Sequence, residues 1–120
     1  MPNPLPALTL IYRANIFVVS RARASLQMGR DDGNDIVVVS LFASRRHASV
    51  QWRDGQFVLT DLSSNGTFVL ADEEAGAQPA EIRLRQEEAV LTGRGWLGLG
   101  RSATTHGGHS VRFTVQAEMA

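Results

Sequence analysis

The stretch DLSSNGT, residues 61–67, joins two segments with the apolar alternation of β-strands, QFVLTD (56–61) and TFVLA (67–71). It brings a carboxylate, hydroxyls, an amide and a glycine together in one short turn. Asn65-Gly66 alone predicts a turn that needs a positive φ. A turn of that kind has no need of the neighbouring hydroxyls, so these small polar side chains indicate a loop with a binding role.

Outward from this turn, the chain is a series of short β-like segments separated by turn residues. Asp54-Gly55 predicts a hairpin between two alternating runs, and the turns recur at the spacing of a β-sandwich or barrel. We therefore predict an all-β fold. Only AEIRLRQEEAVL (80–91) offers a helical alternative, and the period of two in its first half favours strands. The predicted strands cover residues 7–12, 15–20, 24–29, 35–39, 47–52, 56–61, 67–71, 81–85, 88–92, 96–100 and 109–117.

Composition limits the classes of protein that fit. A chain of 120 residues is the size of one domain, and it contains no cysteine for a disulfide or a Cys-based zinc site. The 12 basic residues, all arginine, balance 12 acidic residues, so no overall field favours nucleic acid or a membrane surface. We expect a cytoplasmic protein without membrane insertion, divided into a linker (1–7), one domain (8–117) and a tail (118–120).

Three predicted loops carry the polar side chains. Arg30 follows the strand that ends in QMG, Ser44 and Arg45 precede His47, and Ser64 and Asn65 lie in the opening stretch. In a sandwich, loops from alternate strand ends gather at one pole. Guanidinium, hydroxyl, amide and backbone N–H groups in one concavity suit an oxyanion, above all a phosphate. The same loops contain no paired carboxylates and no metal triad, so no cofactor, metal or catalytic residue is expected.

The order and separation of GRDDGNDIVV, SRRHASV and DLSSNGTFV resemble those of the forkhead-associated (FHA) domain, over roughly residues 8–116. The resemblance implies an eleven-stranded β-sandwich, with its binding loops at one pole, that binds phosphothreonine peptides and is not an enzyme. It implies phosphopeptide contacts for Arg30, Ser44, Arg45, Ser64 and Asn65. It also implies loop-supporting roles for Gly29, His47 and Gly66.

Peptide specificity and biological context are further expectations from the resemblance. The segment VSLFA before Ser44 places Leu41 and Phe42 where they would select an apolar residue three places after the phosphothreonine; alternatively, Phe42 turns into the core. A phosphorylated partner implies a bacterial Ser/Thr kinase pathway. The segments LTLIYR and EIRLRQEEAVLTGRGWLGLGRS are similar to FHA domains attached to class III nucleotide cyclases, so we expect a module near the C-terminus of a larger protein, the rival being a small free-standing adaptor.

Several alternatives remain open at the level of sequence. A degenerate FHA scaffold would bind partners without phosphate, and a nucleic-acid binder would use the arginines, although the zero net charge disfavours it. Ser44, His47 and Asp61 are the residue types of a hydrolase triad. His106 and His109 have a spacing that a metal could use, but no third ligand lies nearby in the sequence. The longer, acidic 72–80 loop and the late segment GRGWLGLGRSATTHGGH depart from the family pattern.

Overall fold

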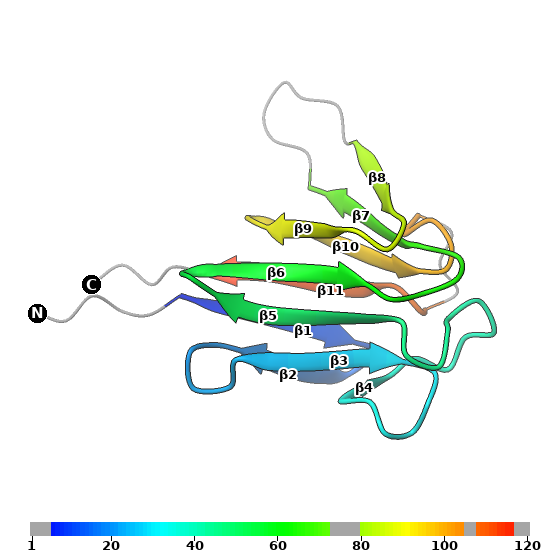
Figure 1. Cartoon of the computed structure of the whole chain (residues 1–120), viewed down its shortest axis with the longest axis horizontal. Helices are drawn as coiled ribbons and strands as arrows, with labels where there is room; N and C mark the ends of the chain where they lie inside the picture. Colours follow the sequence, from blue (N-terminus) through cyan, green and yellow to red (C-terminus); the bar gives the residue numbers. More distant parts are fainter. Residues whose placement is uncertain (1–5, 73–79, 105–107, 117–120) are drawn as a thin grey trace, which may run out of the picture.

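The computed structural model describes residues 6–72, 80–104 and 108–116, which form eleven β-strands in two sheets packed face to face (Figure 1). The described residues contain no helix, and therefore none long and apolar enough to cross a membrane. The predicted tail, residues 1–5 of the predicted linker (1–7) and most of the 72–80 loop lie outside these residues, while Ala7 is the first residue of a strand. The all-β, eleven-stranded sandwich expected from the sequence is confirmed.

The strands divide between two sheets of unequal size. The six-stranded sheet contains, in spatial order, β2 (Asn15–Val19), β1 (Ala7–Tyr12), β11 (Val111–Gln116), β10 (Arg94–Leu99), β7 (Thr67–Ala71) and β8 (Glu81–Leu84). The five-stranded sheet contains β4 (Ile36–Val37), β3 (Ser25–Gly29), β5 (Ala48–Arg53), β6 (Gln56–Asp61) and β9 (Glu88–Leu91). Every neighbouring pair is antiparallel except β3 and β4.

The alternation of side chains along the strands builds the core between the sheets. Leu8 and Leu10 of β1 are fully buried, as are Leu26 and Met28 of β3. These pairs are two residues apart because successive side chains of a strand point to opposite faces. Burying one such side chain completely is worth about 1.5–3 kcal/mol, so the period-two pattern read from the sequence is also the main source of stability.

The predicted strand over 35–39 is wrong in extent. Only Ile36 and Val37 form β4, which runs parallel to β3. The N–H of Val38 donates to the Gly29 carbonyl at 2.8 Å, and the N–H of Val39 donates to the Tyr12 hydroxyl at 3.2 Å. The first bond continues the pairing of the chain with β3 by one residue, and the second ties the chain to Tyr12 of the other sheet. Beyond them, the apolar run continues as the loop that leads to Ser44.

The Asp54-Gly55 hairpin is confirmed. Both residues have positive φ, +52° and +81°, as a type I′ turn requires. The turn lies at the end of the sandwich opposite the loop that follows β6 (Figure 1). The sandwich therefore has two distinct poles, and the three polar loops singled out by the sequence belong to the same one.

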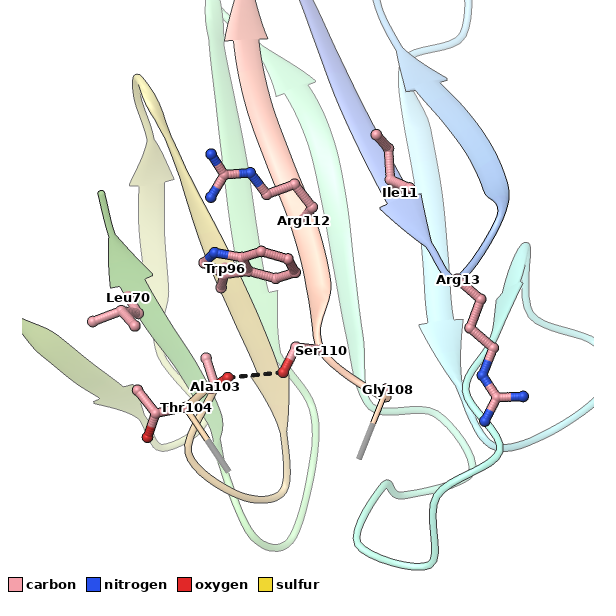
Figure 2. Close-up of a pocket in the computed structure, with 9 residues that line it drawn as sticks. All are labelled: Ile11, Arg13, Leu70, Trp96, Ala103, Thr104, Gly108, Ser110 and Arg112. Atoms are coloured by element: carbon pink, nitrogen blue, oxygen red, sulfur yellow. Dashed lines mark hydrogen bonds between the residues drawn. The ribbon is translucent and has the colours of Figure 1, made fainter. Parts of the chain in front are cut away.

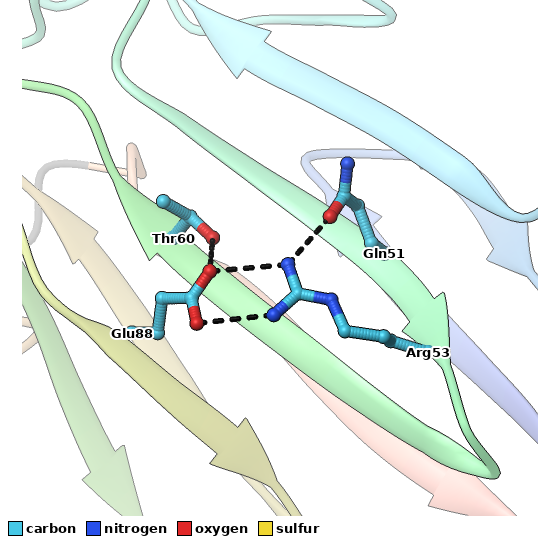
Figure 3. A network of polar contacts seen from close by, with 4 residues as sticks. All are labelled: Gln51, Arg53, Thr60 and Glu88. Atoms are coloured by element: carbon cyan, nitrogen blue, oxygen red, sulfur yellow. Dashed lines mark hydrogen bonds and ion pairs between the residues drawn. The ribbon is translucent and has the colours of Figure 1, made fainter.

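A surface network ties together the outer face of the five-stranded sheet (Figure 3). Arg53 of β5 donates to both carboxylate oxygens of Glu88 of β9, each at 3.1 Å. Gln51 and Thr60 complete the network through the side chains of Arg53 and Glu88. The hydrogen bonds from Arg53 and Thr60 hold the pKa of Glu88 below its usual value. Each of the four side chains bonds to at least one of the others, so the network links β5, β6 and β9 on this face of the sheet.

Candidate functional site at the loop pole

The end of β3 is locked to the loop before β5, which places Arg30. A Cβ atom on Gly29 would overlap the Arg45 carbonyl oxygen, so only glycine allows this approach. The N–H of Arg30 donates to the Ser44 carbonyl at 2.9 Å, and the N–H of Asp31 donates to the Arg45 carbonyl at 3.1 Å. The supporting role implied for Gly29 thus has a geometric basis in this structure.

The side chain of Arg30 is exposed at this pole. Its Nε atom donates to the carbonyl oxygen of Ala43 at 3.2 Å, and no carboxylate lies within ion-pair distance among the described residues. Arg45 is likewise exposed and forms no ion pair with residues in the described ranges. Neither guanidinium group is therefore paired with a carboxylate of the described residues, and both can bind an external anion.

His47 is fully buried behind this surface and connects two of the loops. Its Nδ1 atom accepts from the Ser44 N–H at 2.9 Å, so the proton of the neutral ring is on Nε2, which donates to the Gly66 carbonyl at 2.9 Å. Burial lowers the pKa of His47 below 6.5, although the Gly66 carbonyl and the charge of Asp61 act in the opposite direction. His47 is therefore neutral and structural at neutral pH.

Asp61 organises the DLSSNGT loop from inside. Its carboxylate accepts from the Ser63 hydroxyl at 2.6 Å, the Thr67 hydroxyl at 2.7 Å and the Gln86 N–H at 2.8 Å. Burial alone would raise the pKa of Asp61, but hydrogen bonds from Gln86, Ser63 and Thr67 outweigh it and lower the pKa. The Ser63 hydroxyl in turn accepts from the Gly66 N–H at 2.8 Å, so one buried anion holds the whole turn in shape.

Ser64 and Asn65 form the exposed crest of this turn. The N–H of Ser64 donates to the Ser44 hydroxyl oxygen at 3.2 Å, which joins the second and third loops at the surface. Gly66 has a φ of +93°, and a Cβ atom on it would lie 2.8 Å from Nε of Arg83. The supporting position of Gly66 therefore requires glycine for both conformation and space.

Arg83 is a residue of the site that the sequence did not single out. From β8 it donates to the Asn65 carbonyl through Nε at 3.1 Å and Nη2 at 2.7 Å. Its guanidinium also lies 5.3 Å from the centre of the Phe68 ring. Arg83 is exposed on β8, but nothing in the sequence reveals that it holds the crest of a loop 18 residues earlier.

Leu41 and Phe42 also lie exposed on the loop before Ser44. Leu41 is 89% exposed and Phe42 is 47% exposed, so Phe42 does not turn into the core. The guanidinium of Arg101 lies 4.4 Å above the Phe42 ring. A Cβ atom on Gly100 would overlap the Phe42 carbonyl, and the Gly100 N–H donates to the Gly66 carbonyl at 2.9 Å. The atypical late segment therefore supports the same pole.

The hydrolase alternative does not fit this geometry. Both ring nitrogens of His47 are engaged with backbone groups, Nδ1 with the Ser44 N–H and Nε2 with the Gly66 carbonyl. The Ser44 hydroxyl accepts a backbone hydrogen bond, and the Asp61 carboxylate is occupied by donors of its own loop. Neither ring nitrogen of His47 is left to take a proton from Ser44.

Only one of the two histidines of the HGGH segment lies among the described residues. His106 lies outside the described residues. His109 stacks on Tyr12, with 6.3 Å between the ring centres, and its Nδ1 atom lies 2.9 Å from the Tyr12 hydroxyl. Within the described residues no three His, Cys, Asp or Glu side chains are grouped to hold a metal ion.

Comparison with known proteins is consistent with this geometry. A family model described as the FHA domain matches residues 26–91. The FHA-1 domain of Rv1747 from Mycobacterium tuberculosis superposes with a TM-score of 0.66 at 20% identity, covering 92% of this chain and 97% of that one. The FHA domain of CT664 from Chlamydia trachomatis gives 0.60 at 19% identity, with 97% and 99% covered.

A third similar structure is M. tuberculosis EmbR, which was determined in complex with a low-affinity phosphopeptide. Its TM-score is 0.62 at 24% identity, and the match covers 98% of this chain but 25% of EmbR. A comparison with curated protein sequences finds no match. At these identities the solved structures establish the shared fold.

Proposed function

This chain belongs to the FHA domain family, and on that premise we propose that it binds phosphothreonine peptides through Arg30, Ser44, Arg45, Ser64 and Asn65. FHA domains are binding modules that take part in phosphothreonine-dependent interactions. The observation that carries the proposal is the junction of three loops at Ser44. Its carbonyl binds the Arg30 N–H, and its hydroxyl binds the Ser64 N–H.

The chemistry of the pole suits a dianionic phosphate. Exposed Arg30 and Arg45 provide the positive charge, and the Ser44 and Ser64 hydroxyls provide donors that can rotate toward the phosphate oxygens. Such charge-assisted hydrogen bonds are about twice as strong as neutral ones. The Asn65 side chain makes only a 3.5 Å contact with the Phe42 carbonyl, which leaves its amide available to bind the peptide backbone.

Peptide selection would come from the loop before Ser44. Arg101 covers the ring of Phe42, so Leu41 offers the more open apolar surface beside the phosphate pocket. We propose that this surface selects an apolar residue three places after the phosphothreonine. Discrimination between phosphothreonine and phosphoserine would rest on burying one methyl group, worth about 0.8 kcal/mol for the transfer alone.

The biological setting proposed for this module is bacterial Ser/Thr kinase signalling. Phosphorylation of a partner protein would recruit the domain, spanning about residues 8–117, and so localise or regulate an attached or partner output domain such as a nucleotide cyclase. Immunoblotting of source cells with an antibody to this domain tests the attached form. A single band near 13.1 kDa, the mass of this chain, would rule it out.

Two experiments test the function itself. An oriented phosphothreonine peptide library is screened first, and titration calorimetry then measures binding of the selected peptide. We expect binding of the phosphorylated form and none of the unphosphorylated form. Arg30→Ala should weaken binding by about 10- to 100-fold, because it removes a charged hydrogen-bond donor worth about 1.5–3 kcal/mol. Arg21→Ala is the matched control, since Arg21 is also exposed but lies in the turn between β2 and β3.

Three results would distinguish the alternatives. Equal binding by wild type and Arg30→Ala would reject the pocket assignment. Equal binding of phosphorylated and unphosphorylated peptides would identify a phosphate-independent scaffold. Binding to an oligonucleotide with a steep salt dependence would favour the nucleic-acid alternative.

A further inference from the structure

The outer face of the six-stranded sheet carries a groove that is lined by none of the residues proposed to bind the phosphopeptide. The groove has a volume of about 670 Å³. Figure 2 shows its floor crossing from Leu70 of β7, over Trp96 of β10, to Ile11 of β1. Arg112 lies beside Trp96, and Arg13 lies near the β1 end.

The strand register makes this groove part of a longer apolar band. In order across the sheet, Ile16 of β2 pairs with Ile11 of β1, and Ile11 pairs with Arg112 of β11. Arg112 pairs with Trp96 of β10, and Trp96 pairs with Leu70 of β7. Cross-strand partners share a face of the sheet, so these five side chains form one row across five strands. Ile16 is 67% exposed and Trp96 is 40% exposed, which leaves the row open to solvent.

The charge along this band is positive. Arg112 makes a bidentate pair with Asp72, at 2.7 and 2.8 Å, and Arg94 reaches the same carboxylate at 3.4 Å. Two guanidinium groups therefore share one carboxylate. Arg13 has no carboxylate within 4.0 Å among the residues that the structure describes. The three arginines Arg13, Arg94 and Arg112 therefore outnumber the one carboxylate, Asp72, with which two of them pair.

One acidic group borders the opposite end of the groove. Glu81 pairs with Leu70 in the register, and its carboxylate accepts from the Ala103 N–H at 2.8 Å and the Ser102 hydroxyl at 2.9 Å. These bonds engage Glu81 with the chain that forms the groove wall. No carboxylate lines the groove within the described part of the chain.

We propose that this band docks a segment of a partner protein in which apolar side chains are flanked by carboxylates, and that this docking does not require phosphorylation. An aromatic ring beside an arginine is the composition of interface hot spots. The apolar row continues beyond the groove to Ile16, farther than an enclosed small-molecule site would extend. A second copy of this chain fits poorly, because a two-fold interface would bring the same cationic patches together.

Selection of peptides from a phage-displayed library of random 12-residue sequences tests this docking. The displayed peptides carry no phosphate, so any binding is independent of phosphorylation. We expect selected peptides to combine aromatic or aliphatic residues with Asp or Glu. Their affinity should fall at least tenfold in Trp96→Ala and severalfold in Arg13→Gln. Arg30→Ala should bind them as wild type does, which separates this proposal from the phosphopeptide function.

Val90→Ala and Arg21→Gln are the matched controls. Val90 is a similarly exposed apolar residue on the five-stranded sheet, and Arg21 lies in the turn between β2 and β3. Unchanged melting temperatures and phosphopeptide affinities would show that the groove variants remain folded. The proposal is overturned if no peptide is enriched over the Trp96→Ala protein, or if selected peptides bind all variants equally. Concentration-dependent dimerisation that Trp96→Ala abolishes would also overturn it in favour of a second copy.

Discussion

The Nε2 atom of His47 donates to the Gly66 carbonyl oxygen at 2.9 Å, although the two residues are 19 positions apart. At its other ring nitrogen the same side chain accepts from the Ser44 N–H. One buried imidazole therefore sets the spacing of the two loops whose hydroxyls are proposed to bind phosphate.

His47→Ala should destabilise the domain by about 2–4 kcal/mol, because it leaves a cavity and the Ser44 N–H without a partner, while the Gly66 carbonyl keeps the Gly100 N–H. Phosphopeptide affinity should fall as well, since the Ser44 and Gly66 loops lose their buried connection. Chemical denaturation and calorimetry measure the two effects. His109→Ala, which removes a half-buried ring just before β11, should cost less; equal losses in both variants would contradict this role for His47.

Stability should decrease as the pH falls through about 6.5. The pKa of His47 in the folded state lies below 6.5, so the unfolded chain binds the proton more readily. The free energy of unfolding is therefore fully retained above about pH 6.5 and falls toward the folded-state pKa, by at most about 1.4 kcal/mol per pH unit. Thermal melts should show a flatter pH profile in His47→Gln than in His109→Gln. A profile unchanged by His47→Gln would refute the assignment.

Phosphopeptide affinity should fall below about pH 6, where a phosphate takes up its second proton. Burial lowers the pKa of His47, so proton uptake by its ring is separated from that of the phosphate by changing the ligand. Calorimetry from about pH 5 to 7.5 measures this dependence. A difluorophosphonate ligand, whose second pKa is lower, should shift the midpoint downward; a flat profile would mean that the dianion is not the species recognised.

Gly100→Ala should weaken both stability and binding. Gly100 has a φ of +85°, and the added methyl group would overlap the Phe42 carbonyl, so the loop that precedes Ser44 must shift. Gly93→Ala measures the cost of a side chain at positive φ without a steric clash, because Gly93 has a φ of +62° and open space around it. That variant should lose about 1–2 kcal/mol of stability and keep its affinity. Equal affinities for the two variants would argue against support of the site by Gly100.

Leu41→Asp should change peptide preference without abolishing phosphate recognition. Leu41 is the most exposed large apolar residue among those described near the site, so the substitution should leave the melting temperature within about 2–4 °C of wild type. In a peptide array the variant should lose the preference for an apolar residue three places after phosphothreonine. Selection of Asp or Glu at that position by the wild type would refute the proposed specificity.

The sequence by itself determined which segments form strands and which loops carry polar groups. The side chains of a strand alternate with a period of two, and Asp54-Gly55 accepts the positive φ angles of a hairpin turn. Strands and hairpin turns can be read from the sequence because each depends only on residues close together in the chain. The polar set from Arg30 to Asn65, which we propose to bind phosphate, was also visible, because a site for phosphate needs particular residue types. The over-long strand at 35–39 was an error, since apolar character does not distinguish a strand from a buried loop, and several other predicted strand ends differ from the structure by one or two residues.

Only the tertiary structure decided which distant groups meet. Arg83 holds the Asn65 carbonyl, and Gly100 makes room for Phe42, through approaches that depend on strand order and loop closure. The band from Ile16 to Leu70 likewise exists because five strands from separate parts of the chain align in one register. Alternation along each strand shows that a side chain faces outward, but the pairing of the strands sets what lies beside it.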